Sequence, residues 1–150
     1  MDKSWFLKNF DELTCRELYD LLSARNEVFV VGQNCNYLDT DGKDFQCLHL
    51  FCKIDNEIAA YCRIIPPGIS YSETSIGRVL TRDKFRNLGL GKELVNLAIE
   101  SALNAFPGNN IKIGAQSYLL KFYSDFGFEV FGEEYLEDKI PHHKMILKKW

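Results

Sequence analysis

The sequence predicts an α/β (α+β) protein in which a mixed central sheet is flanked by helices. Three observations support this prediction: two strand-like segments joined by a short polar turn, two amphipathic helical patterns, and strand patterns that alternate with helices in the second half of the chain. Alternation of this kind is typical of sheets that are covered by helices. The expected order is a helix, three strands, a helix, a strand, a helix and two final strands.

The first helix is expected from Thr14 to about Val30. Thr14 and Glu17 have the spacing of a capping box, in which two side chains satisfy free N–H groups at a helix start. Apolar residues then recur at helical spacing, and Gly32 is expected to end the helix. The preceding residues 4–10 could supply a further strand.

A polar turn region is expected over residues 33–44. Its segment 39–42, Asp-Thr-Asp-Gly, resembles the start of a calcium loop, but an EF-hand needs ligand side chains at fixed offsets and a glutamate at its twelfth position. Counted from Asp39, the fifth position is Lys43 and the twelfth is Leu50. A turn is therefore the better interpretation.

The remaining elements follow from hydrophobic periodicity and from helix- and strand-breaking residues. They are strands at 48–54 and 58–65 joined by a hairpin turn, a strand at 74–80, a basic loop at 81–88, a helix from Gly89 to before Pro107, a strand at 111–115, a helix from Ser117 to about Phe126 with Gly127 at its C-terminal cap, and two strands within 129–150 around a turn at 138–141. We expect one domain that spans residues 1–150.

Composition and charge exclude several classes of function. Hydrophobic residues make up 46% and charged residues 26% of the 150 residues, which is ordinary for a globular protein. The 18 basic and 21 acidic residues leave a net charge of −3, so no chain-wide surface for nucleic acid is expected. No segment approaches the roughly 18 apolar residues of a membrane span, and the first residues lack a signal-peptide pattern. We therefore expect neither a nucleic acid nor a membrane as partner.

The cysteines indicate a reducing compartment. There are five of them, an odd number, and no Cys-x-x-Cys spacing occurs, so a cytoplasmic location is expected. Cys47, His49 and Cys52 lie close in sequence, but alternation along a strand places Cys52 on the opposite face from the other two. No metal site is expected there, because the three side chains could not converge.

The segment from Val79 to Lys92 is the strongest candidate for a binding site. A strand leads into a loop that holds Arg86, Gly89 and Gly91, and a helix leaves that loop. Glycines let backbone N–H groups approach a ligand, and a helix N-terminus adds free N–H groups and partial positive charge. Residues 82–92 contain four basic residues and one acidic residue, a local charge of +3. The segment is therefore a candidate phosphate-binding loop.

Two well-known phosphate loops do not fit this segment. A Walker loop requires Ser or Thr at the position of Glu93, and its first glycine is missing. The dinucleotide fingerprint requires a glycine at the position of Leu94. A glycine-rich turn that only caps a helix stays an alternative at this point.

A second segment, residues 116–128, favours one interpretation. Together with the candidate phosphate loop it resembles the GNAT superfamily of acyl-CoA-dependent N-acetyltransferases. The family's Arg/Gln-x-x-Gly-x-Gly/Ala loop and its Tyr-x-x-x-Gly-Phe pattern match Arg86, Gly89, Gly91, Tyr123, Gly127 and Phe128. The resemblance covers nearly the whole chain, and it implies a mixed, mostly antiparallel central sheet flanked by helices.

Within that superfamily the chain resembles the ElaA-like proteins. The segments that carry this resemblance are 25–39, 76–79, 114–116 and 140–142. One departure is Gly32, where the ElaA-like pattern commonly carries a glutamate. This departure concerns the acceptor side of the implied pocket and not its CoA side.

The resemblance implies an N-acetyltransferase that uses acetyl-CoA as co-substrate. A primary amine, on a small molecule or a peptide, would attack the thioester directly within a ternary complex. The implied CoA-binding residues are Val79, Leu80, Thr81, Arg86, Asn87, Leu88, Gly89, Leu90, Gly91, Lys92 and Gln116. Backbone N–H groups of the loop would hold the pyrophosphate, the end of the third strand would pair with the pantetheine, and a backbone N–H near Leu80 would stabilise the oxyanion.

Tyr123 would protonate the departing CoA thiolate in this scheme. A phenol suits that task because its ordinary pKa of about 10 lies near that of an alkyl thiol. The alternative is a core aromatic side chain packed beside Leu119 and Phe126. The residues alone leave both interpretations open.

No residue is clearly marked as the base that takes the proton from the amine. The candidates are Glu73, Ser75, His49 and His142, and a relay through water to bulk solvent is equally plausible. Cys35 or Cys62 could instead carry the acyl group, but no Cys–His pairing is visible, and direct transfer is the simpler expectation.

Two other classes of function stay open at the level of sequence. The first is a non-catalytic acyl-CoA-binding sensor or interaction module, which would have no need of the Tyr123 phenol. The second is a nucleotide-phosphate-binding protein, which the two failed motifs weaken. The strands near the C-terminus could leave an edge for a second copy of the chain, so a homodimer is a further expectation.

Overall fold

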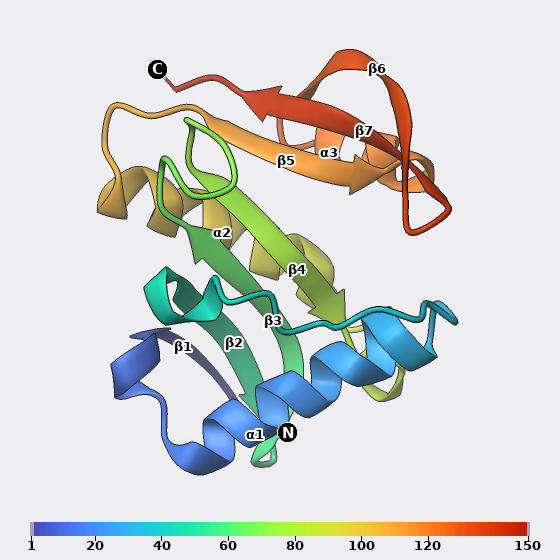
Figure 1. The fold of residues 1–150 in the computed structure, drawn as a ribbon. Coiled ribbons are helices and arrows are strands. Elements are labelled where there is room, and N and C mark those ends of the chain that lie inside the picture. Colours follow the sequence, from blue (N-terminus) through green and yellow to red (C-terminus); the bar gives the residue numbers. More distant parts are fainter. Residues whose placement is uncertain (1, 150) are drawn as a thin grey trace.

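The structure is a computed structural model and describes residues 2–149. Its helices and strands are, in chain order, β1 (Lys3–Asn9), α1 (Cys15–Arg25), β2 (Leu48–Ile54), β3 (Glu57–Ile65), β4 (Ser75–Thr81), α2 (Leu90–Ala105), β5 (Ile111–Gln116), α3 (Leu120–Ser124), β6 (Glu129–Glu137) and β7 (Ile140–Leu147) (Figure 1). The strand that residues 4–10 could supply is present as β1, and each expected strand and helix has a counterpart.

The strands form two antiparallel sheets that meet at one end. Strands β1-β2-β3-β4 make the first sheet and β5-β7-β6 the second. A parallel bridge between Thr74 and Ile111 joins them, and the Lys112 N–H donates to the Thr74 carbonyl at 2.8 Å. Beyond this point β4 and β5 separate toward their C-terminal ends (Figure 1). The prediction of a mixed, mostly antiparallel sheet flanked by helices is confirmed.

Helices cover both faces of the sheets. One apolar cluster packs α2 and α3 against β2, β3, β5 and β7, and it contains Leu94, Tyr123 and Met145. A second cluster packs α1 against the other face of β2, β3 and β4, through Leu21, Tyr61 and neighbouring residues. No helix within residues 2–149 is long and apolar enough to span a membrane.

Helix α1 begins with the predicted capping box and ends in a wider turn. The Glu17 N–H donates to Thr14 Oγ1, and the Thr14 N–H donates to Glu17 Oε1, both at 3.0 Å. The helix continues as a π-helical segment, Asn26–Val31, so it reaches about as far as predicted. Gly32 follows with an ordinary helical φ, and an added Cβ there would lie 2.8 Å from the carbonyl oxygens of Glu27 and Val28. Glycine is therefore required for close packing, and a glutamate at this position would force the turn to change.

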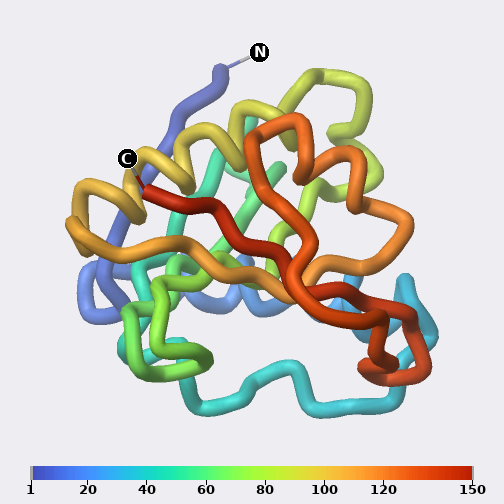
Figure 2. The backbone as a smooth tube through the Cα atoms, turned by 90° about the horizontal axis from the view of Figure 1, so that it is seen from above, coloured from blue at the N-terminus to red at the C-terminus, as the bar shows by residue number. Residues whose placement is uncertain are grey.

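Two tight turns close the hairpins. Asp55 and Asn56 have φ values of +50° and +69° between β2 and β3, and Asp138 and Lys139 have +51° and +65° between β6 and β7. Two consecutive positive φ values are those of a type I′ turn, whose twist matches the flanking strands. The second hairpin reaches back to the loop after α1, where the Cys35 thiol lies 3.9 Å from the Asp138 carbonyl (Figure 2).

The expected helix from Ser117 to Phe126 is partly wrong. Ser117–Leu119 forms a single 3-10 turn, and α3 spans only Leu120–Ser124. Ser117 does not cap the helix, because its hydroxyl contacts Glu134 at 3.0 Å and His143 at 2.9 Å instead. Gly127 has a φ of +99°, in agreement with its expected place after the helix.

Candidate active site

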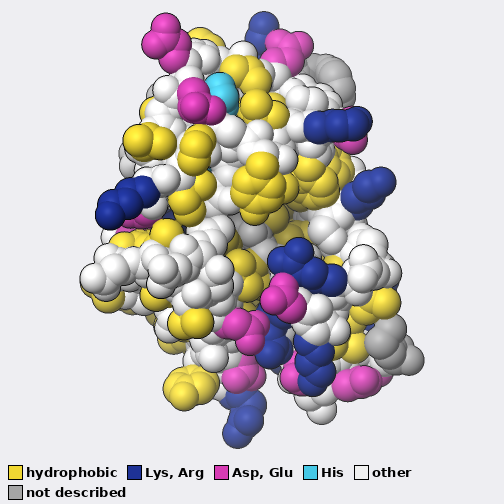
Figure 3. All heavy atoms as spheres, turned by 90° about the vertical axis from the view of Figure 1, so that its right-hand side faces the viewer, with side chains coloured by type: hydrophobic (Ala, Val, Ile, Leu, Met, Phe, Trp, Pro, Cys, Tyr) yellow, Lys and Arg dark blue, Asp and Glu magenta, His cyan; other side chains and the backbone are white. Residues whose placement is uncertain are grey.

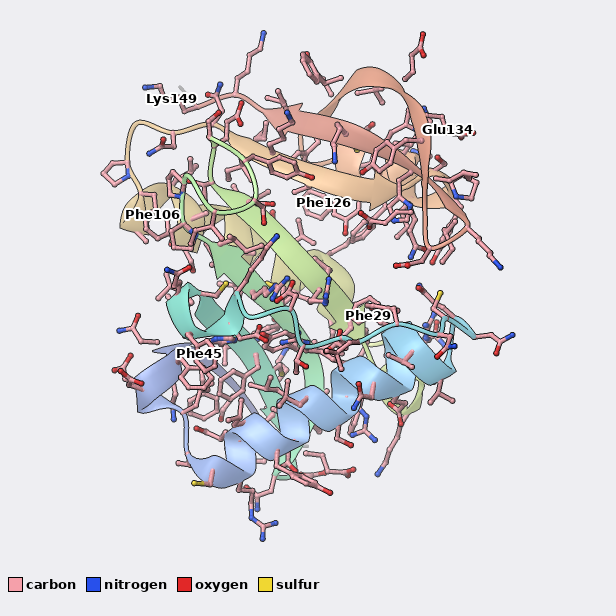
Figure 4. The ribbon with its side chains drawn as sticks, in the orientation of Figure 1. Phe29, Phe45, Phe106, Phe126, Glu134 and Lys149 are labelled. Carbon is pink, nitrogen blue, oxygen red and sulfur yellow. The ribbon has the colours of Figure 1, made fainter. Side chains whose placement is uncertain are left out.

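A cleft of about 1030 Å³ occupies the gap between β4 and β5. Its walls come from the ends of β4 and β5, the start of α2, α3, the loop after α1, and the β6–β7 hairpin. Figure 3 shows this side of the molecule, with the surface hollowed between its upper and lower parts. In Figure 4, Phe29 from the turn after α1 lies beside the C-terminal end of β4, and it is one of the lining residues.

The phosphate loop predicted from sequence lines this cleft. Gly89 caps α2 with a left-handed φ of +74°, which strains any residue with a side chain. The first helical acceptor, the Gly89 carbonyl, takes the Glu93 N–H at 3.3 Å, so the N–H groups before Glu93 are left without helical partners. An added Cβ on Gly91 would lie 3.8 Å from the Phe122 ring and 3.9 Å from Thr81 Oγ1. The passage between β4, α2 and α3 is therefore narrow at Gly91.

The local charge of the loop is smaller than the sequence count of +3. Arg82 pairs with Glu27 at 2.9 Å, and Lys84 pairs with Glu57 at 2.7 Å. Both carboxylates come from distant segments, and neither Arg82 nor Lys84 lines the cleft. Arg86 pairs with Asp83 within the loop at 2.7 Å.

Lys92 differs from these three basic residues. It lines the cleft and has no ion pair within residues 2–149. The positive potential at the loop therefore comes mainly from the helix N-terminus and Lys92, with Arg86 at the mouth.

Strand β4 carries a bulge next to the predicted oxyanion donor. Tyr61 pairs with Leu80 and Arg63 pairs with Gly77, so two β4 residues oppose the single residue Cys62. One of the two, Arg78, has a φ of +51°, which is rare for a residue with a side chain. A bulge leaves one residue of the strand without ladder partners. Strand β4 is also the edge of its sheet and, within residues 2–149, is bridged to β5 only at Thr74, so backbone groups near Leu80 that point away from β3 face the gap.

Ion pairs hold the bulge and the loop after α1 together. Arg78 Nε lies 2.9 Å from Asp39 Oδ1, and Arg25 Nε lies 2.8 Å from Asp39 Oδ2. Arg25 also reaches Asp44 at 2.7 Å, and Arg63 bridges Asp44 and Asp41. Burial alone would raise the pKa of Asp44, but the hydrogen bond and charge of Arg25 lower it below its ordinary value. The aspartates that resembled a calcium loop are thus the partners of arginines.

Tyr123 is packed among aromatic side chains and also lies on the wall of the cleft. Its ring packs edge-on against Phe122 and Phe128, with centroids 5.1 and 6.0 Å apart, yet the residue lines the cleft. Its hydroxyl has no hydrogen-bond partner in the described part of the chain. Burial raises the pKa of Tyr123 well above its ordinary value, so the phenol stays protonated at neutral pH.

Nearly all of the CoA-binding residues expected from sequence line the cleft. Leu88 does not, and its side chain points to solvent. Leu80, the expected oxyanion donor, and Gln116 at the end of β5 both lie on the wall. Sequence reasoning missed a set of aromatic lining residues, because they come from segments far apart in the chain: Phe29, Tyr37, Tyr71, Tyr118 and Phe122.

The candidate bases differ in whether they line the cleft. His49 is fully buried outside the cleft, where its ring nitrogens contact the Tyr61 hydroxyl at 2.7 Å and the Asp44 carbonyl at 2.9 Å. Glu73 hydrogen-bonds Ser72 and does not line the cleft either. Ser75 and His142 do line it. Of the candidate bases, Ser75 and His142 therefore lie on the cleft wall, and His49 and Glu73 do not.

The candidate acyl-carrying cysteines are not paired with a histidine. Cys62 is fully buried between the sheet and its helices, and burial raises the pKa of its thiol. Cys35 contacts the carbonyl oxygens of Gln33 and Asp138. Neither thiol has an activating base among its hydrogen-bond partners in residues 2–149, which favours direct transfer.

Known proteins that resemble this chain agree with the geometry of the cleft. Residues 36–149 match the family described as acetyltransferase (GNAT) domain. The UPF0039 protein of Synechocystis sp. is 38% identical over 99% of this chain and 97% of its own length. Protein ElaA of Escherichia coli is 36% identical over 92% of each chain.

Solved structures agree as well. An acyl-CoA N-acyltransferase from Pseudomonas aeruginosa superposes with a TM-score of 0.93, at 36% identity, over 98% of this chain and 100% of that chain. Escherichia coli ElaA superposes with a TM-score of 0.92, at 34% identity, over the same shares. The chain therefore belongs to the GNAT acetyltransferase family, and its relatives there are the ElaA and UPF0039 proteins.

Proposed function

We propose that this protein is an N-acetyltransferase that moves an acetyl group from acetyl-CoA to a primary amine, by direct attack within a ternary complex. One observation carries the proposal: a single cleft passes through the gap between β4 and β5, with the phosphate loop and Tyr123 in one wall and the loop after α1 in another. Such a passage lets two substrates meet from opposite faces of the sheet. A GNAT acetyltransferase from Elizabethkingia anophelis that shares this fold, at 19% identity, was solved with acetyl-CoA bound.

Acetyl-CoA would be held mainly by backbone groups. The free N–H groups of Leu90, Gly91 and Lys92 would bind the pyrophosphate, with Arg86 beside it. The end of β4, from Val79 to Thr81, would pair with the pantetheine amides. A free backbone N–H beside Leu80 would then lie near the thioester carbonyl and stabilise the oxyanion.

Tyr123 would act on the sulfur. When the tetrahedral intermediate collapses, the carbon–sulfur bond breaks and the thiolate leaves with the electron pair. The phenol of Tyr123, which has no hydrogen-bond partner among residues 2–149, would supply the proton that completes the CoA thiol. Burial keeps this phenol protonated, although the raised pKa makes it a weaker acid than an ordinary phenol. As the amide forms, its nitrogen loses a proton. This proton returns to the phenolate oxygen of Tyr123 and restores the phenol.

The acceptor would enter from the loop after α1 and the β6–β7 hairpin. On that side, the wall of the cleft carries aromatic and apolar side chains as well as charged ones. They are Phe29, Tyr37, Leu38, Asp41 and Lys43. These side chains can accommodate an amine on a small molecule or at the end of a peptide.

The proposal is tested by following free thiol and acetylated product with acetyl-CoA and a set of probe amines. Suitable probes are n-butylamine, 2-phenylethylamine, spermidine, free lysine and a short peptide with a free N-terminus. We expect thiol release that depends on the amine and is matched by acetylated product. Tight acetyl-CoA binding without turnover of any amine would favour the non-catalytic sensor instead.

Thermal shift separates the remaining alternative. A ligand raises the melting temperature only if it binds the folded state more tightly than the unfolded chain. We expect shifts with CoA and acetyl-CoA and none with ATP or NAD. A shift with ATP but not with CoA would contradict the proposal and favour a nucleotide-binding protein.

A further inference from the structure

His142 lies on the wall of the cleft. It lies near the start of β7, where its partner across the β5–β7 ladder is Gln116, the last residue of β5. The imidazole is only 6% exposed, yet it lines the cleft together with Gln116 and Tyr123. A histidine on the wall of a cleft between two substrates can exchange a proton with either of them.

The hydrogen bonds of His142 determine which nitrogen is available. Nδ1 lies 2.7 Å from the Ile140 carbonyl oxygen. A carbonyl oxygen only accepts, so Nδ1 carries the proton and donates it. In the neutral ring Nε2 then holds the free lone pair, and Glu137 Oε2 lies 3.6 Å from it. His142 is therefore held in the tautomer that a base requires.

His49 provides the internal contrast. It is also buried, but both of its ring nitrogens are engaged by neighbouring protein groups, Tyr61 and Asp44. Burial lowers the pKa of His49, which favours a neutral ring in a structural role. His142 differs because, among residues 2–149, only Nδ1 has a protein partner at hydrogen-bond distance.

His142 and Tyr123 approach the gap from opposite faces of the sheet. Side chains alternate along a strand, so His142 and Lys144 share one face of β7, while Met145 and Leu147 share the other. Met145 and Leu147 pack in the same apolar cluster as Tyr123, on the α2 and α3 side. His142 therefore faces the α1 side, from which the acceptor would enter.

We propose that His142 is the general base that takes the proton from the acceptor ammonium, an inference that rests on the proposed function. Nε2 accepts one proton from the ammonium and becomes part of an imidazolium. The neutral amine then forms the carbon–nitrogen bond at the thioester carbonyl, whose π electrons move to the oxygen. The imidazolium later releases its proton to bulk water, and Tyr123 completes the thiol as described above.

Charged and titratable groups of both signs lie around His142. The titratable and charged groups from the elements packed around it are Tyr135, Glu137, Asp138, Lys144 and Tyr37. Glu137 favours the imidazolium, and Lys144 opposes it while hydrogen-bonding the Tyr71 and Tyr135 hydroxyls. Because the Glu137 side chain is largely exposed, its assistance is partly screened by solvent.

The test compares two variants and two nucleophiles. His142→Asn keeps an N–H that can donate to the Ile140 carbonyl but removes the base. His143→Asn is the matched control, because His143 lies on the opposite face of β7 and contacts Ser117. Each protein is assayed with the fastest alkylamine probe, which is an ammonium at neutral pH, and with methoxyamine, which is already neutral there.

We expect His142→Asn to lower kcat/KM for the alkylamine by about 10²-fold, the low end for general acid–base catalysis. The loss should be clearly smaller with methoxyamine, because its nitrogen is already neutral and needs no base before it attacks. Acetyl-CoA affinity, measured by isothermal titration, should not change. His143→Asn should behave as wild type with both nucleophiles.

Each other outcome overturns the inference in a distinguishable way. Equal losses with both nucleophiles, together with a lower melting temperature, would make His142 a structural residue and leave the proposed function standing. An unchanged alkylamine rate in His142→Asn would show that His142 is not the base, and this result too would leave the proposed function standing. If the wild-type protein acetylates none of the probes, the proposed function fails, and the role of His142 fails with it.

Discussion

The phosphate loop and the loop after α1 both line the cleft, but they are built from different kinds of interaction. The phosphate loop presents backbone N–H groups of consecutive residues at the start of α2, and its arginine at the mouth is paired only within the loop. The loop after α1 presents side chains, and arginines from α1, β3 and β4, the first two of them buried, hold it in place through Asp39, Asp41 and Asp44. The first arrangement depends on a few neighbouring residues, and the second on contacts between distant segments.

This difference teaches where each side of the cleft is vulnerable. A site made of backbone groups tolerates most side-chain changes but fails where a glycine is replaced. A site held by buried ion pairs fails when one partner is removed, because an uncompensated charge stays in the interior. Substitutions on the two sides of the cleft should therefore have different effects on stability and on binding.

Removing Arg25 should cause the largest loss of stability. Its guanidinium is fully buried and reaches both Asp39 and Asp44. Arg25→Met would leave two buried carboxylates without this partner, so we expect the free energy of unfolding to fall by about 3–5 kcal/mol. Urea denaturation measures the change.

Arg86→Met is the matched control from the phosphate loop. The ion pair of Arg86 with Asp83 is largely exposed, at 62% and 91%. Its loss should lower the free energy of unfolding by less than about 1 kcal/mol. Similar losses in the two variants would contradict the contrast between the two sides of the cleft.

Tyr123→Phe should have the next largest effect, on the chemical step. The substitution keeps the ring contacts with Phe122 and Phe128 and removes only the hydroxyl. We expect kcat to fall by about 10²-fold with little change in acetyl-CoA affinity, because the lost interaction belongs to the transition state. Steady-state kinetics and isothermal titration on the same variant test this. A wild-type kcat with chemistry rate-limiting would make Tyr123 a packing residue only.

Gly91→Val should weaken acetyl-CoA binding without unfolding the protein. The methyl groups would enter the passage toward Phe122 and Thr81 and block the backbone donors. Losing one hydrogen bond to a charged phosphate corresponds to about a tenfold or larger rise in Kd.

Gly91→Ala is a milder substitution that should weaken acetyl-CoA binding less than Gly91→Val. Its single Cβ would lie at ordinary contact distance, and alanine favours a helix over glycine. We therefore expect a smaller rise in Kd and a melting temperature at least as high as that of the wild type. Normal acetyl-CoA affinity in a folded Gly91→Val protein would refute the assignment of the loop.

The smallest expected effect concerns stability at acidic pH. Burial would raise the pKa of Glu17, but the Thr14 backbone N–H, Lys8 and Lys53 lower it to about 2. Because the folded pKa lies below the ordinary value, this carboxylate stabilises the fold above about pH 4.5. The contribution is lost as pH falls toward 2.

Glu17→Gln should therefore flatten the dependence of stability on pH between these limits. Glu57→Gln is the comparison from the phosphate-loop side, where Lys84 and Arg82 lower the pKa of an exposed carboxylate. Its effect should be weaker and should vanish in high salt, because exposed ion pairs are screened. Denaturation at several pH values checks both variants, and a steeper acid loss in Glu17→Gln would be incompatible with this prediction.

Much of the fold could be predicted from sequence because its signals are local. The capping box of Thr14 and Glu17, the alternation in β2 and β3, and the glycines before α2 each act within a few residues. Where a prediction failed, a side chain from a distant segment formed a hydrogen bond that the local sequence did not indicate. Ser117 was expected to cap a helix, but Glu134 and His143 hold its hydroxyl.

The candidate site divides in the same way. Its CoA side follows from the spacing of Arg86, Gly89 and Gly91, since backbone N–H groups and a helix N-terminus are local properties. The acceptor side does not, because the positions of His49 and His142 relative to the cleft depend on how β2 and β7 pack. Even the charge of the basic loop was changed by Glu27 and Glu57, which lie far away in sequence.

By itself the sequence determined the family, the order of helices and strands, and the loop that would receive a phosphate, because hydrophobic period, capping and glycine spacing operate over a few residues. Only the tertiary structure decided that β4 and β5 separate, that aspartates of a calcium-like loop bind three arginines, and that His142 rather than His49 faces the cleft. These outcomes depend on burial and on ion pairs between segments, and the free energy of such contacts is defined only once the chain has packed.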